Sequence, residues 1–233
     1  MCHGKASAFF PTPEVKGEIS TEIEALYFGD EGASKRLAIL PDIYGANAFY
    51  QGLSTYLARK GCRVYLTNPF HEFGELPEVT REAAFERRHK LKDKDFIDRF
   101  EAFCNAQTVD GVIGFCLGGY YIFELARRNV NQDLVGFYGF PQGFQNQDPL
   151  QVPYEYLATI EKKHVSLMPG QDMSVGVENV NKLKEIADAN ANLQLTVYEA
   201  SGHGFLADLD SDNSILRENA LESLKQCEAA LGV

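Results

Sequence analysis

Three residues in this chain have side chains that could act together in covalent catalysis: Cys116, Asp172 and His203. A short apolar run precedes each of them, at 109–113, 164–168 and 193–198. A thiol needs a base to accept its proton, and a histidine base needs a group that fixes its tautomer. Cysteine, aspartate and histidine supply the nucleophile, the orienting acid and the base, so the set predicts nucleophilic attack by sulfur.

Cys116 lies in the segment Gly114-Phe115-Cys116-Leu117-Gly118-Gly119, between an apolar run and a helix-like run over 120–128. This strand–turn–helix context is typical of a nucleophile elbow, with a thiol where the usual pattern has a serine hydroxyl. The small flanking residues leave room for a strained central residue, and the positive end of the helix dipole favours thiolate. Two alternatives stay open: a small buried cysteine, and a glycine-rich phosphate cradle, although G-x-C-x-G-G does not match G-x-G-x-x-G.

The partners of Cys116 also have ordinary structural explanations. Asp172 could be only a helix cap, since aspartate is a favoured capping residue. His203 lies in Gly202-His203-Gly204, where a histidine is commonly a solvated loop residue, but its place between the last strand and the last helix favours catalysis. The other histidines are poorer candidates: His3 in the tail, His71 in a loop, His89 in a charged helix and His164 at a strand start.

The alternation of short apolar runs with amphipathic runs predicts an α/β fold: a doubly wound, mostly parallel sheet flanked by helices. The strands are expected at 17–28, 37–40, 63–67, 109–113, 133–138, 164–168 and 193–198, and the helices at 48–59, 80–104, 120–128, 177–189 and 214–231. The charged stretch 87–92 is expected to form a solvated face. No repeat or linker is visible, so we expect a single domain over residues 1–233.

Ligands of such sheets bind at the carboxyl ends of the strands. Cys116, Asp172 and His203 each come just after a predicted strand, and so does Asp42. We therefore expect all four side chains on one rim of the sheet. Asp42 could simply cap the helix that follows it, or it could tune the thiol.

The composition narrows the function classes. The net charge is −11, which argues against general nucleic-acid binding and against a polybasic membrane contact. No apolar stretch is long enough for a transmembrane helix, and the start lacks the apolar core of a signal peptide. The five cysteines are scattered without a C-x-x-C pair, so no zinc site, metal or disulfide framework is indicated. We expect a cytoplasmic monomer.

From about residue 37 to its end, the chain resembles the dienelactone hydrolase (carboxymethylenebutenolidase) family of the α/β-hydrolase superfamily. The resemblance is carried by four segments: 42–49 (DIYGANAF), 114–119 (GFCLGG), 170–172 (GQD) and 202–205 (GHGF). It implies an α/β-hydrolase fold and a small-molecule ester or lactone substrate that is hydrolysed through a thioester, without a cofactor. It also implies that Cys116 is the nucleophile, His203 the base and Asp172 the orienting acid.

The same resemblance implies an oxyanion hole formed by the backbone N–H groups of Leu117 and Ile43, and a substrate carboxylate held by Arg81. The chain departs from the family pattern at two places. Asp42 stands where the family typically has a glutamate that holds the resting thiol, and the segment 205–208 contains no arginine where the family has a second one. The missing arginine favours less anionic or different esters and lactones over dienelactone itself.

Two other functions compete with this one. A class I glutaminase also places a cysteine on a glycine-rich elbow. Its residues follow the order Cys…His-x-Glu, with the acid after the histidine, whereas here the acid precedes His203. A catalytically silent member of the same fold could instead bind a small acid, or a protein partner, through the same cleft. A complete triad argues against that alternative.

Overall fold

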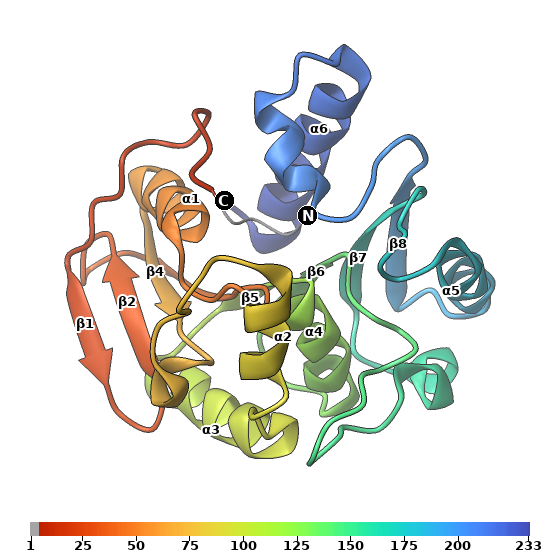
Figure 1. Ribbon diagram of the computed structural model, residues 1–233, viewed down its shortest axis with the longest axis horizontal. Coiled ribbons are helices and arrows are strands. Elements are labelled where there is room, and N and C mark those ends of the chain that lie inside the picture. Colours follow the sequence, from red (N-terminus) through yellow and green to blue (C-terminus); the bar gives the residue numbers. More distant parts are fainter. Residues whose placement is uncertain (1–4) are drawn as a thin grey trace.

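The computed structural model describes residues 5–233 and contains one eight-stranded sheet (Figure 1). Its strand order is β1-β2-β4-β3-β5-β6-β7-β8. The pairs β1–β2 and β2–β4 are antiparallel, and the other neighbours are parallel. The strands are β1 (Gly17–Ser20), β2 (Glu24–Phe28), β3 (Lys35–Leu40), β4 (Cys62–Thr67), β5 (Gly111–Phe115), β6 (Asp133–Phe137), β7 (His164–Pro169) and β8 (Leu193–Tyr198).

Helices cover both faces of this sheet. They are α1 (Ala48–Arg59), α2 (Arg81–Arg88), α3 (Asp93–Ala106), α4 (Leu117–Arg127), α5 (Val177–Ala189) and α6 (Ser214–Leu231), with short 3₁₀ turns η1 (His71–Phe73), η2 (Pro153–Glu155), η3 (Leu157–Thr159) and η4 (Phe205–Asp210). The connection through α1 runs along the sheet in the direction opposite to those through α3 and α4. Because such connections are right-handed, the two directions place their helices on opposite faces. Figure 1 shows α1 and α6 on one side and α3 and α4 on the other.

The centre of the sheet is buried on both faces, which explains its continuous apolar strands. Every residue of β5 is buried, and so are the first ten residues of α4.

Local hydrogen bonds mark where helices begin. The side chain of Asn47 accepts the N–H of Phe49 (2.9 Å) at the start of α1, and the side chain of Asn213 accepts the N–H of Ile215 (3.0 Å) at the start of α6.

Two predicted elements differ in the structure. The edge strand expected over 17–28 is a hairpin of β1 and β2, and the long helix expected over 80–104 is divided into α2 and α3. The helix breaks between Arg88 and Asp93, and these two residues form a buried ion pair with 2.6 Å between Nη2 and Oδ2. In one continuous helix they would be five positions apart and would not share a face. The break allows them to meet.

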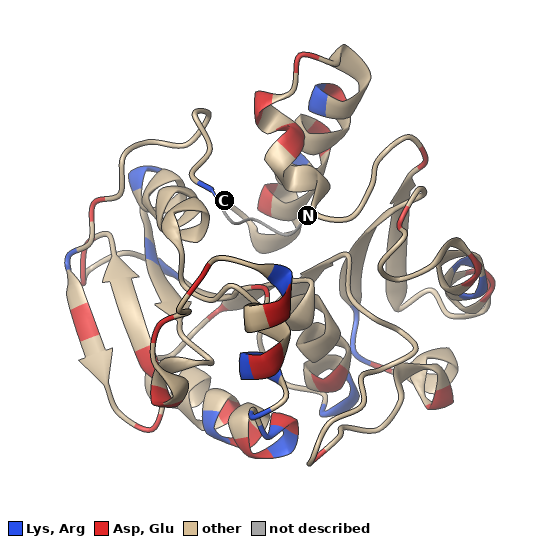
Figure 2. Ribbon diagram, in the orientation of Figure 1, with Lys and Arg blue, Asp and Glu red and all other residues tan. Residues whose placement is uncertain are grey.

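The prediction of a solvated face over 87–92 is wrong for half of the stretch. Arg87, Arg88 and Leu91 are buried, whereas His89, Lys90 and Lys92 are exposed. Figure 2 shows blue and red interspersed on α2 and α3, while the strands are mostly tan. Arg87 donates to backbone carbonyls 44 and 13 residues away, and Arg88 pairs with Asp93 across the helix break, contacts that a local charge pattern does not reveal. No helix within residues 5–233 is long and apolar enough to cross a membrane.

Candidate active site

The turn between β5 and α4 has the geometry of a strained elbow. Cys116 has a φ of 54°, a region that residues other than glycine rarely adopt. Its N–H donates to the carbonyl of Phe137 at 3.0 Å, which extends the contact between β5 and β6 by one residue. The flanking glycines are packed against backbone: a Cβ on Gly114 would lie 2.2 Å from the carbonyl oxygen of Gly118, and one on Gly118 would lie 2.0 Å from that of Leu40. The elbow therefore requires both glycines.

The thiol of Cys116 sits at the N-terminus of α4, where backbone N–H groups and the helix dipole favour a negative charge. Leu117 is the first residue of α4 and is fully buried, so its N–H lies at the same helix end. The other described thiols have a different environment. Burial raises the pKa values of Cys62, Cys104 and Cys227, which keeps these groups protonated.

Asp172 follows the carboxyl end of β7 and holds His203 directly. Its Oδ2 accepts a hydrogen bond from Nδ1 of His203 at 2.8 Å. Its Oδ1 accepts the N–H groups of Ser174 (2.7 Å) and Val175 (2.8 Å). The carboxylate is fully buried, and it both caps its own turn and orients the histidine. With its proton on Nδ1, His203 presents Nε2 as the nitrogen that can accept another proton.

His203 lies against aromatic rings that come from the loop after β6. The ring of Tyr138 is 5.0 Å from the imidazole between centroids, and the ring of Phe140 is 5.5 Å away. The side chain of His203 is 6% exposed. Strands β5, β6, β7 and β8 are consecutive neighbours in the sheet. The structure therefore places Cys116, Asp172 and His203 along one carboxyl edge, as the sequence predicted.

Asp42 lies at the same edge, after β3, which is the other neighbour of β5. It is fully buried, and its Oδ1 accepts the N–H of Tyr44 at 2.8 Å. Its carbonyl accepts the N–H of Gly45 at 3.0 Å. We call residues 42–45 the oxyanion loop, after the role that the family resemblance implies for the N–H of Ile43. This tight turn directly follows β3, which pairs with the elbow strand β5.

The sequence did not predict that Arg87 belongs to this region. Arg87 of α2 donates from Nη2 to the carbonyl of Ile43 at 3.1 Å. The two residues are 44 positions apart, and Arg87 belongs to a charged run, so the sequence contained no local signal for the contact.

The predicted substrate residue, Arg81, is exposed at the first position of α2, and its guanidinium lies 5.3 Å over the ring of Phe85. A cavity of about 520 Å³ opens between the oxyanion loop and the segment before α2. Its lining includes Tyr44, Asn47 and Arg87, but not Arg81. Within residues 5–233, no group of three or more His, Cys, Asp or Glu side chains is arranged to hold a metal ion.

Comparison with known proteins identifies the family. The model of the dienelactone hydrolase family matches residues 23–228. The chain belongs to the dienelactone hydrolase family. It is 46% identical over 215 residues to carboxymethylenebutenolidase 2 of Cupriavidus pinatubonensis, which covers 92% of each protein. It is 33% identical over 227 residues to carboxymethylenebutenolidase of Rhodococcus opacus, covering 91% of this chain and 89% of that protein.

Solved structures show the same fold at low sequence identity. A dienelactone hydrolase-type structure from Klebsiella pneumoniae aligns with a TM-score of 0.79 at 19% identity, covering 93% of this chain and 97% of that one. Esterase 2 of Thermogutta terrifontis, phosphorylated by paraoxon, aligns with a TM-score of 0.65 at 13% identity, covering 94% and 95%. These results confirm both the family and the α/β-hydrolase fold predicted from the sequence motifs.

Proposed function

We propose that this member of the dienelactone hydrolase family hydrolyses small-molecule esters or lactones through a thioester on Cys116. The observation that carries the proposal is the buried Asp172–His203 pair, on the strand edge that also presents a cysteine with a φ of 54°. The two relatives described above are carboxymethylenebutenolidases, which supports a lactone as the substrate class.

In the proposed acylation step, Nε2 of His203 takes the thiol proton and the sulfur of Cys116 attacks the substrate carbonyl. The carbonyl oxygen becomes an oxyanion that accepts hydrogen bonds from the N–H groups of Leu117 and Ile43. One such donor typically contributes about 10²–10³ in rate. The tetrahedral intermediate then expels an alkoxide or enolate, which takes the proton from Nε2. For a lactone, this leaving group stays attached to the acyl chain.

In deacylation, His203 removes a proton from water, and the resulting hydroxide attacks the thioester carbonyl. The intermediate expels the thiolate of Cys116, and the proton on Nε2 returns to sulfur. Because thiolate is itself a good leaving group, a tetrahedral intermediate formed from a stable amide would return to substrate. Activated esters, enol esters and lactones therefore suit this site better. The scheme uses no metal and no organic cofactor.

The substrate preference follows from the missing arginine in the segment 205–208. Arg81 is the arginine that we propose to hold a substrate carboxylate, and the segment 205–208 supplies no second one. We therefore expect a preference for less anionic or different esters and lactones. A screen should compare each carboxylate substrate with its methyl ester, using the parent enzyme and Arg81→Met. Equal rates for both substrates of each pair would remove Arg81 as an anchor.

The decisive experiment is the Cys116→Ala variant, assayed with aryl esters and lactones. We expect a loss of about 10⁴-fold or more in kcat, as is usual when a covalent nucleophile is removed. Activity that survives this change would show that the nucleophile is a different group.

A catalytically silent protein is separated from an enzyme by labelling with iodoacetamide in a Cys2→Ser background. The proposal expects pH-dependent alkylation of Cys116 ahead of Cys62, Cys104 and Cys227, whose pKa values burial raises. A silent protein would show no such selectivity.

We also propose that the protein is cytoplasmic, that it is a monomer and that it has a single domain. The edge strand β1 is only four residues long and carries Glu18, features that discourage edge-to-edge pairing of sheets. Light scattering after size-exclusion chromatography should give a mass near 26.0 kDa, and twice that mass would overturn the monomer.

A further inference from the structure

Arg87 has surroundings that are unusual for an arginine in a helix. Its side chain comes from the second-last residue of α2, yet the residue is only 9% exposed. The guanidinium carbon lies 4.4 Å above the centroid of the Phe70 ring. Burial lowers the pKa of Arg87, and the negative charge of Asp42 opposes this shift, so the two charges are close enough to interact. A buried cation needs compensation of this kind to remain charged.

The hydrogen bonds of Arg87 go to backbone rather than to acidic side chains. Nη2 donates to the carbonyl of Ile43 at 3.1 Å, and Nη1 donates to the carbonyl of Gly74 at 3.2 Å. The planar guanidinium holds its two Nη groups at a fixed spacing. Arg87 therefore bridges the oxyanion loop and the segment that leads into α2.

The carbonyl of Ile43 is part of a peptide group that is held at both ends. The same peptide contains the N–H of Tyr44, which donates to Oδ1 of Asp42 at 2.8 Å. Because a peptide group is planar, these two contacts fix the orientation of the whole unit. The preceding peptide contains the N–H of Ile43, and its carbonyl accepts from the N–H of Gly45 at 3.0 Å. Neither peptide can rotate without breaking one of these bonds.

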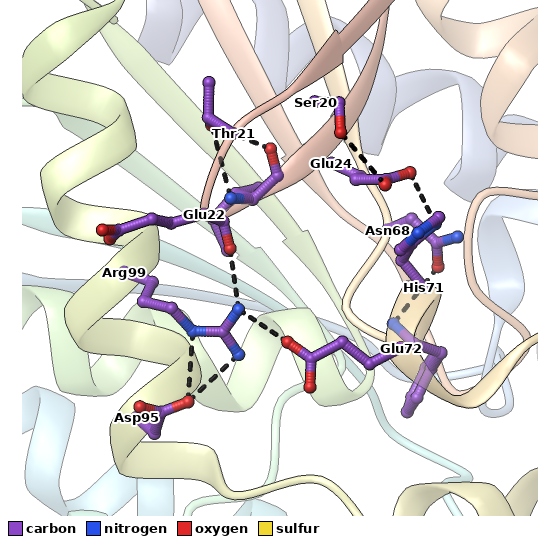
Figure 3. Close-up of polar contacts among 11 residues, drawn as sticks. Ser20, Thr21, Glu22, Glu24, Asn68, His71, Glu72, Asp95 and Arg99 are labelled. Atoms are coloured by element: carbon purple, nitrogen blue, oxygen red, sulfur yellow. Dashed lines mark hydrogen bonds and ion pairs between the residues drawn. The ribbon is translucent and has the colours of Figure 1, made fainter.

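The other side of the bridge is anchored as well. Figure 3 shows Arg99 of α3 between Asp95, Glu72 and the carbonyl of Glu22, and His71 beside Glu24. Arg99 donates to the Glu22 carbonyl at 2.7 Å and to Oε1 of Glu72 at 3.0 Å. These contacts tie η1 to the β1–β2 turn and to α3. Gly74 follows η1 directly, and its N–H donates to the carbonyl of His71 at 3.1 Å.

We infer that Arg87 is a positioning residue that holds the oxyanion loop, and with it the N–H of Ile43, in the orientation that donates a hydrogen bond to a developing oxyanion. The inference rests on the proposed function, because it needs a reaction with a tetrahedral intermediate. Arg87 acts through the Ile43–Tyr44 peptide and does not touch the reacting atoms. Asp42 and Arg87 bracket this peptide from opposite ends, which gives the buried Asp42 a role other than holding the resting thiol.

The test compares Arg87→Met and Arg87→Lys with Lys90→Met, an exposed control that removes one positive charge from the turn after the same helix. For each variant, kcat and KM are measured with a neutral aryl ester and with an aryl ester that carries a carboxylate, and the urea midpoint reports folding. The rate of alkylation of Cys116 by iodoacetamide is measured in parallel. Alkylation needs the thiolate but forms no oxyanion, so it separates the oxyanion loop from the thiol.

For Arg87→Met we expect kcat to fall about 10–100-fold, part of the effect of losing an oxyanion donor, while KM and the alkylation rate change less than about threefold. Arg87→Lys keeps the charge but reaches only one carbonyl, so its kcat should be intermediate. Lys90→Met should match the parent. If the urea midpoint shows that Arg87→Met is unfolded, the Lys variant decides by the same criteria.

Three outcomes would overturn the inference. A kcat within twofold of the parent in folded variants would mean that the bridge has no catalytic effect. Equal falls in kcat and in alkylation would mean that Arg87 acts on the thiol through Asp42. A rise in KM confined to carboxylate substrates would make Arg87 a substrate anchor in the cavity that it lines. Failure of the proposed function is recognised separately, by activity that survives Cys116→Ala in an otherwise unchanged chain.

Discussion

The two buried aspartates at the carboxyl edge of the sheet are held in place in different ways. Asp172 is fixed by its own segment, since Oδ1 accepts N–H groups two and three residues further along the chain. The loop of Asp42 also has a local bond, to Tyr44, but the carbonyl of Ile43 depends on Arg87, which is 44 residues away. The acid side of the site is therefore anchored in a local turn at Asp172, although its bond to His203 spans 31 residues, whereas the oxyanion side depends on a tertiary contact at the loop itself. Changes far from the site should affect the second side and spare the first.

The largest effect is expected from Asp172→Asn, which breaks the locally built side. Asparagine can still accept the two N–H groups, but its amide would donate to Nδ1 of His203 and favour the wrong tautomer. We expect kcat to fall about 10³–10⁴-fold with the fold retained, as happens in other triads. The control is Asp188→Asn, an exposed residue on α5. A loss smaller than about tenfold would show that His203 does not depend on this carboxylate.

Gly118→Ala should have the next largest effect, because Gly118 joins the elbow to β3. The new Cβ would lie 2.0 Å from the carbonyl oxygen of Leu40, and backbone on both sides must move. We expect the free energy of unfolding to fall by about 3 kcal/mol or more. In Gly32→Ala the new Cβ would have no neighbour within 4 Å, and the change should stay within about 1 kcal/mol. Urea denaturation measures both, and equal small losses would contradict the close packing.

His164 allows the pH dependence of stability to be separated from that of activity. It begins β7, at the end opposite Asp172, and burial lowers its pKa from 6.5 to about 4. The unfolded chain therefore binds a proton that the folded chain rejects between these pH values. The stability is present above pH 6.5 and is lost as the pH falls towards 4, by about 3 kcal/mol in total.

We expect His164→Gln to remove this part of the pH dependence, as measured by urea denaturation at several pH values. The pH profile of kcat should keep its shape, because the active-site groups are unchanged. If the parent and the variant lose stability equally between pH 6.5 and pH 4, His164 is not the group responsible.

Much of the fold and of the local side of the site was predictable from the sequence. The strands at 164–169 and 193–198 and the helices at 177–189 and 214–231 follow from local periodicity and turn signals. The elbow, Asp172 and His203 were visible because each follows its own strand.

The sequence did not reveal the break between α2 and α3 or the burial of Arg87 and Arg88. A charged run normally indicates a solvated surface. Here the Arg88–Asp93 pair and the Arg87–Ile43 contact override that local preference. The Arg87–Ile43 contact joins residues 44 positions apart, and the Arg88–Asp93 pair forms only because the helix breaks between the two residues, so helix periodicity identified neither of them.

The smallest effect is expected from Arg99→Met, which weakens the outermost support of the oxyanion side. The ion pairs of Arg99 are partly exposed, so we expect the free energy of unfolding to fall by only about 1 kcal/mol. We also expect kcat to fall by less than about threefold, through a looser Gly74 segment. Arg59→Met, which breaks the exposed pair with Glu14, serves as the control and should leave kcat unchanged. If Arg99→Met and Arg59→Met have equal kcat values, Arg87 supports the oxyanion loop without any contribution from Arg99.

The packing of Gly118 against Leu40 has a consequence for protein engineering. This close packing between Gly118 and Leu40 does not involve the side chain of residue 116, so it does not depend on which nucleophile the elbow carries. A Cys116→Ser variant should keep the same frame and exchange only the attacking atom, from a soft, polarisable sulfur to a harder oxygen. The preference of this scaffold among electrophiles could then be altered by a single atom, without redesigning the surrounding loops.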